Sequence, residues 1–225
     1  MRFIRTSSFL AAVLAVALLA GCSTPAPVPP AVTAPPPQPA PPLAAPVQSQ
    51  SQNQDQDQDQ DRQIVKGQFQ QAIAFMRAGK DREATALFAN IAKLDPALAS
   101  PHTNLGILFY REAKLDQAEA AFKDALRLDA KDYVAANYLG MIYRQQGRFS
   151  DSEAAYLQAL RAKPDYGYAH LNLAILYDIY LDNLPRALDH YQEYQRISGD
   201  SDQQLAGWLA DLRQRMKTLG EEPKP

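Results

Sequence analysis

The sequence predicts an all-helical fold, a solenoid built from repeated pairs of antiparallel helices. From residue 75 onward, aromatic residues recur with a spacing of 34 residues, and small residues stand three or four positions before them. Residues three or four apart share one face of a helix, so each small residue and its aromatic neighbour belong to one helical stripe. A fixed period of this length is typical of solenoids, whose units bury a continuous core by packing on one another.

The repeated positions define two helices in each unit. The aromatic residues of the first helices are Phe75, Phe109, Tyr143 and Tyr177. Those of the second helices are Phe88, Phe122, Tyr156 and, one residue late, Tyr191, preceded by the small residues Ala84, Ala118, Ser152 and Ala187. In the first helices, Gly106 and Gly140 each lower helix propensity by about 1 kcal/mol relative to alanine. We therefore expect another helix to pass close to both glycines.

The first 21 residues have the features of an export signal. Arg2 and Arg5 precede an apolar run from Phe9 to Ala20, and this run is too short to span a bilayer comfortably. The residues Leu19-Ala20-Gly21-Cys22 resemble the bacterial lipobox. That resemblance implies cleavage before Cys22 and attachment of a diacylglycerol and an N-acyl chain to this cysteine. The alternative is an ordinary secretory signal in which the cysteine occurs by chance.

Composition supports the lipoprotein interpretation and limits the partners. Cys22 is the only cysteine of the 225 residues, so an exported chain cannot form an internal disulfide. In lipoproteins of this kind, a residue other than aspartate after the cysteine, here Ser23, implies transfer to the outer membrane. Loss of the two leader arginines takes the net charge from −2 to about −4. The charge therefore indicates neither nucleic-acid binding nor membrane attachment through a basic patch.

Residues 22–62 are expected to form a disordered linker after the lipidated cysteine. The segment from Ser23 to Val47 contains eleven prolines and favours extended polyproline II. The segment from Gln48 to Asp61 contains no apolar residue and therefore has nothing to bury. Its alternating aspartates lack the glycine and the terminal glutamate of a calcium loop, so a solvated spacer is the preferred interpretation.

The folded part, residues 63–219, resembles the tetratricopeptide repeat. The second unit carries His102, Leu105, Gly106, Phe109, Ala118 and Phe122, and the third carries Ala136, Leu139, Gly140, Tyr143, Ser152, Tyr156 and Pro164. The resemblance implies four helix-turn-helix repeats at about 65–98, 99–132, 133–166 and 167–200. Turns are expected at 78–80 and 146–148, where Gly79 and Gly147 can end a helix in the left-handed conformation.

The fourth repeat and the C-terminal segment depart from the regular pattern. The fourth repeat gains one residue in its turn, and Pro185 suits the first turn of the following helix. A capping helix at 201–219 carries apolar residues at helical spacing, and residues 220–225 form a tail. We expect Trp208 to pack against the fourth repeat; its use as a partner contact is the alternative.

The family resemblance also implies where a partner binds, because the first helix of each repeat lines the concave side of the solenoid. Isoleucine and methionine side chains are expected as an apolar floor, with amides, tyrosines and arginines around them. The candidate residues for binding a peptide are Ile73, Arg77, Asn104, Ile107, Tyr110, Arg111, Asn137, Tyr138, Met141, Arg144, Tyr168, Asn172 and Ile175. Asparagine can pair with a peptide backbone and arginine with a carboxylate. The alternative is that several of these residues pack between repeats.

The sequence offers no catalytic site, metal site or cofactor site. His102 and His170 occupy one position two repeats apart, His190 lies on a second helix, and no third ligand is supplied for a metal. No nucleophile elbow, phosphate loop or zinc-protease helix is present. The lysine and asparagine clamp of chaperone-binding repeats is also absent. At the two clamp positions the second repeat has Thr103 and Ile107, and the third repeat has Asn137 and Met141.

A lipidated leader followed by repeats resembles the pilotin and pilus-assembly lipoproteins. That resemblance implies a non-enzymatic scaffold, anchored to the outer membrane and facing the periplasm, that binds a protein or peptide client of a pilus or secretion complex. Two alternatives remain open: an adaptor for cell-wall or polysaccharide machinery, and a non-catalytic subunit of a membrane-bound enzyme. Architecture alone does not distinguish the clients.

Replacement of the lipobox cysteine tests the anchor. We expect the Cys22→Ala chain to leave the membrane fraction, because the acyl chains that contribute about 0.8 kcal/mol per buried CH₂ can no longer be attached. Fractionation of cell envelopes followed by immunoblotting measures the distribution. A Ser23→Ala chain is the matched control and stays with the membrane. Retention of the Cys22→Ala chain in the membrane would contradict acyl anchoring.

Overall fold

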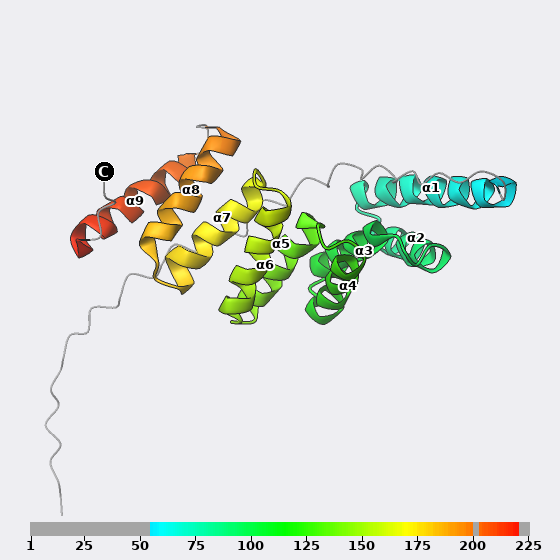
Figure 1. Cartoon of the computed structure of the whole chain (residues 1–225), viewed down its shortest axis with the longest axis horizontal. Coiled ribbons are helices and arrows are strands. Elements are labelled where there is room, and N and C mark those ends of the chain that lie inside the picture. Colours follow the sequence, from blue (N-terminus) through cyan, green and yellow to red (C-terminus); the bar gives the residue numbers. More distant parts are fainter. Residues whose placement is uncertain (1–54, 200–202, 221–225) are drawn as a thin grey trace, which may run out of the picture. The chain divides into compact units, whose positions relative to one another are not determined.

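The computed structural model describes residues 55–199 and 203–220. This part of the chain is all-helical (Figure 1). Its helices are α1 (Asp55–Arg77), α2 (Asp81–Leu94), α3 (Ala99–Arg111), α4 (Leu115–Leu128), α5 (Tyr133–Gln145), α6 (Phe149–Ala162), α7 (Gly167–Ile175), α8 (Leu184–Ser198) and α9 (Gln203–Leu219). A π-helical turn, η1 (Leu176–Tyr180), continues α7. The predicted leader, the predicted lipidation site Cys22 and the linker as far as residue 54 lie outside the described residues.

The helices pack as four successive pairs, which confirms the predicted solenoid. The pairs α1–α2, α3–α4, α5–α6 and α7–α8 have the most extensive contacts. Each pair also contacts the next, and the first helices α3 and α5, and then α5 and α7, touch one another. The capping helix α9 packs on α8. No helix among the described residues is both long enough and apolar enough to span a bilayer.

Helix α1 begins inside the segment that was predicted to be an unstructured spacer. It starts at Asp55, ahead of the expected repeat boundary near residue 65. The first residues of α1 alternate aspartate and glutamine in the sequence. Further along α1, Val65 and Phe69 pack against the core, and the Phe69 ring meets the Phe88 ring edge-on at 5.5 Å. These contacts hold the C-terminal part of α1 on the core, and the same helix extends back to Asp55.

The core is organised by aromatic rings of the second helices resting on small residues of the first. Phe88, Phe122, Tyr156 and Tyr191 are all fully buried or nearly so. A Cβ atom on Gly106 would lie 2.6 Å from Cε1 of Phe122, and one on Gly140 would collide with the ring of Tyr156 in the same way. The glycines thus admit the ring of the paired helix, which explains why the sequence tolerates their low helix propensity.

The turns inside the repeats need a left-handed residue. Gly79 and Gly147 have φ values of 71° and 74°, as predicted for the turns at these positions. Ala113 takes the same conformation in the second repeat, with φ 56°. A left-handed conformation costs a non-glycine residue about 1–2 kcal/mol, so this turn is held by the packing of α3 and α4 rather than by its own preference.

The extra residue of the fourth repeat is absorbed at the end of its first helix. In η1 the chain widens into a π-helical turn, and Asp182 then takes a positive φ of 48°. The Asn183 side chain accepts a hydrogen bond from the backbone N–H of Arg186 at 3.2 Å and caps α8. Pro185 lies in the first turn of α8, as the sequence predicts.

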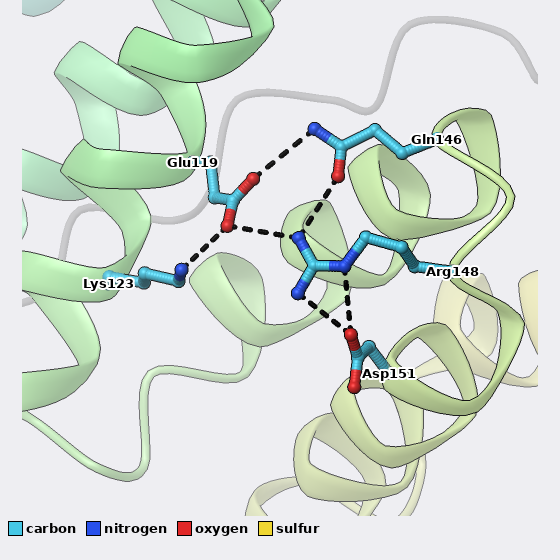
Figure 2. Close-up of polar contacts among 5 residues, drawn as sticks. All are labelled: Glu119, Lys123, Gln146, Arg148 and Asp151. Atoms are coloured by element: carbon cyan, nitrogen blue, oxygen red, sulfur yellow. Dashed lines mark hydrogen bonds and ion pairs between the residues drawn. The ribbon is translucent and has the colours of Figure 1, made fainter.

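A network of charged side chains ties the second repeat to the third (Figure 2). Glu119 of α4 accepts hydrogen bonds from Lys123 at 2.6 Å, from Gln146 at 3.3 Å and from Arg148 at 3.3 Å. Arg148 also pairs with Asp151 and stacks on the Tyr143 ring at 4.0 Å. Partial burial alone would raise the pKa of Glu119, but the three donors hold this pKa below its usual value. Glu119 therefore bridges the second and third repeats.

The capping helix covers the last pair. Leu205, Leu209, Leu212 and Met216 are buried along one stripe of α9. The Trp208 ring lies 6.0 Å from the ring of Tyr191, which confirms the predicted contact with the fourth repeat. Arg215 of α9 pairs with Asp178 of the π-helical turn, so the cap also holds the irregular segment.

A methyl group added at Gly106 tests the ring-on-glycine contact. We expect Gly106→Ala to lower the free energy of unfolding by about 1–2 kcal/mol, because steric overlap with the buried Phe122 ring outweighs the gain in helix propensity. Urea unfolding followed by circular dichroism measures the change.

The matched control is Gly207→Ala, in a helical position of α9 where an added Cβ meets nothing within 4 Å. This variant should raise the free energy of unfolding by up to about 1 kcal/mol. Equal stabilisation by both substitutions would show that the ring does not constrain Gly106.

Candidate protein-binding surface

The thirteen predicted peptide-binding residues divide sharply by burial. Eight of them are buried: Ile73, Asn104, Ile107, Asn137, Tyr138, Met141, Asn172 and Ile175. The side chains of Tyr110, Arg144 and Tyr168 are half-buried, and those of Arg77 and Arg111 are exposed. We refer to these five accessible residues as the first-helix surface.

The predicted apolar floor belongs to the hydrophobic core. Ile73, Ile107, Met141 and Ile175 are at most 7 % exposed and are part of one continuous core cluster. The first helices of successive repeats approach one another closely enough to cover these side chains. The expectation of an open apolar floor is therefore corrected: in this structure the four side chains pack between repeats and offer a peptide no surface.

The predicted asparagines form a buried row of amides. Asn172 donates to Oδ1 of Asn137 at 3.0 Å across two repeats, and Asn104 donates to the carbonyl of Ser100 at 2.8 Å. The Oδ1 atoms of Asn104 and Asn172 are buried and accept no hydrogen bond. A buried acceptor without a donor costs about 1–3 kcal/mol. The Asn137–Asn172 pair thus links the third and fourth repeats from inside, and a peptide backbone cannot reach the buried amides without displacing neighbouring side chains.

Tyrosines connect the first helices of neighbouring repeats. The Tyr110 ring meets the Tyr138 ring edge-on at 5.4 Å, and Tyr138 stacks on Phe122 at 5.1 Å. Gln145 donates a hydrogen bond to the Tyr110 hydroxyl at 2.9 Å. Burial raises the pKa of Tyr138 to about 12 and also raises the pKa of Tyr110. Both hydroxyls therefore remain protonated at neutral pH, and Tyr110 keeps its polar end accessible for a partner.

The three predicted arginines differ in what they already bind. Arg111 lies 3.4 Å from the carbonyl of Met76 and 3.4 Å from a carboxylate oxygen of Asp81, so it joins the second repeat to the first. Arg77 is exposed at the end of α1. Arg144 has its guanidinium carbon 6.0 Å from the centroid of the Tyr180 ring, and its Nη1 atom is buried without an acceptor.

Two histidines, one on α7 and one on α8, form a pair. The Nδ1 atoms of His170 and His190 lie 3.0 Å apart, and Nε2 of His170 lies 2.9 Å from the carbonyl oxygen of Pro164. Because a carbonyl only accepts, His170 carries its proton on Nε2, and its Nδ1 accepts the Nδ1–H of His190. The ring of Tyr177 stacks on His190 at 5.7 Å. Burial, followed by the proximity of His170, lowers the pKa of His190 to about 4.

Sequence reasoning missed this pair and the exposed residues of η1. His170 and His190 occupy different positions of the repeat, and only the packing of α7 against α8 brings them together. Ile179 and Tyr180 lie where the sequence predicts a turn with one extra residue, and that extra residue is the signal that could have marked them. Among the described residues no group of three or more histidine, cysteine or acidic side chains could hold a metal ion. The side chains present on the surface suit binding by hydrogen bonds, ring contacts and charge.

Comparison with known proteins assigns the repeat class. The tetratricopeptide-repeat sequence model matches residues 103–166 and again residues 137–202. Together with the four helix pairs, these matches show that the described part of the chain is an all-helical solenoid with tetratricopeptide repeats in residues 103–202. Proteins with such repeats bind protein partners, and the fold is typically non-catalytic.

Solved structures with the same fold come from several kinds of protein. PilF of Pseudomonas aeruginosa superimposes with a TM-score of 0.62 at 16% identity, over 76% of this chain and 80% of that chain. MamA of Desulfovibrio magneticus superimposes with a TM-score of 0.59 at 18% identity, over 70% of this chain and 89% of that chain. An O-GlcNAc transferase of Thermobaculum terrenum matches with a TM-score of 0.56 at 19% identity, over 60% of this chain and only 26% of its own. At these identities the likeness shows the fold alone. A comparison with curated protein sequences finds no significant match.

The histidine pair predicts a loss of stability in mild acid. The pKa of His190 is about 4 in the folded chain and about 6.5 in the unfolded chain, so the neutral ring stabilises the fold fully above about pH 6.5. That contribution is lost as the pH falls from about 6.5 towards 4. Because the ring is partly exposed, solvent screening reduces the effect, and we expect about 1 kcal/mol.

The test compares melting temperatures of the natural chain and the His190→Gln chain at pH 7.5 and pH 4.5. Acidification should lower the melting temperature of the natural chain by about 2–4 °C more than that of the variant. His102→Gln, which lies outside the pair, is the control and should behave like the natural chain. An equal acid shift in the natural and His190→Gln chains would exclude the pair as the cause.

Proposed function

We propose that this chain is a lipid-anchored scaffold of the bacterial cell envelope that binds a protein client during assembly of a pilus or secretion-type complex. The observation that carries the proposal is the combination of a lipobox ending at Cys22 with a tetratricopeptide-repeat solenoid. The acyl chains fix the location, and the repeats supply the binding surface. The protein is proposed to act by binding and not by catalysis.

The fold comparison supports the repeat-scaffold part of the proposal, and the pilus branch rests on the resemblance of a lipidated leader followed by repeats to the pilus-assembly lipoproteins. PilF shares the fold along most of both chains, which is the arrangement expected for proteins of one architectural type. The outer membrane is the proposed site, because Ser23 follows the lipidated cysteine in the sequence. In this arrangement the linker between Cys22 and α1 holds the solenoid away from the lipid surface, where a client of the periplasm can reach it.

Client binding is assigned to the first-helix surface. Tyrosine and arginine are enriched among the residues that dominate protein interfaces, and this surface presents both. Tyr110 combines an accessible hydroxyl with a ring held by Tyr138, so its position is fixed before a partner arrives. Preorganised side chains lose less entropy on binding than mobile ones.

Site-specific crosslinking in living cells tests this assignment. A photoreactive amino acid at Tyr110 of the full chain should crosslink a pilus or secretin component, identified by mass spectrometry. The matched control carries the same amino acid at Gln117, an exposed position of α4 on the second helix of the same repeat. We expect Tyr110→Ala to weaken binding of the identified client by about tenfold.

The identity of the crosslinked protein decides between the pathways. A cell-wall hydrolase or a polysaccharide synthase at Tyr110 would replace the pilus proposal by the adaptor or the enzyme-subunit alternative. Equal crosslinking from Tyr110 and Gln117 would contradict binding through the first helices.

A further inference from the structure

We draw no further inference here: the strongest candidate, the surface patch formed by the exposed side chains of Ile179 and Tyr180 on the π-helical turn after α7, carries no proposal because nothing in the structure shows what covers it.

Discussion

The close approach of paired helices is the constraint on which the rest of this structure depends. In the second and third repeats an aromatic ring of the second helix lies directly on a glycine of the first, Phe122 on Gly106 and Tyr156 on Gly140. The contact sets how near the two helices lie, and the repetition of the contact gives successive pairs the same internal geometry. The equivalent positions of the first and fourth repeats, Ala72 and Ala174, are fully buried as well. A solenoid of this kind is therefore held by local contacts that each span one pair or two neighbours.

Dense packing between the pairs also decides what is left for binding. The isoleucines and the amides of the first helices fill the space between repeats, so a partner meets tyrosine rings, arginines and hydroxyl groups instead of an apolar floor. Charged bridges such as Glu119 with Arg148 connect neighbouring repeats at the turns (Figure 2). Arg144 lies over the Tyr180 ring, beside the turn of the fourth repeat that departs from the regular geometry.

The irregular fourth repeat shows how a small sequence change alters a repeat surface. The extra residue widens the end of the first helix into the π-helical turn, which turns Tyr180 outward and leaves Asp178 to pair with Arg215 of the capping helix. The cap thus stabilises the irregular segment while its other face stays accessible. Together with the proposed acyl anchor, this arrangement gives a scaffold whose location is fixed at one end of the chain and whose contact surfaces lie on the repeats.

The sequence by itself determined the repeat class, the number of helix pairs, the glycine turns and the contact of Trp208 with the fourth repeat. Those features follow from spacing. Residues three or four positions apart lie on one face of a helix, and residues 34 positions apart occupy equivalent places in successive repeats. Only the tertiary structure decided the burial of the predicted floor, the pairing of His170 with His190 and the exposure of Tyr180. These depend on how closely neighbouring helices approach and on where one extra residue is absorbed. A periodic pattern identifies which side chains face a neighbouring helix, but it does not contain the distance to that helix.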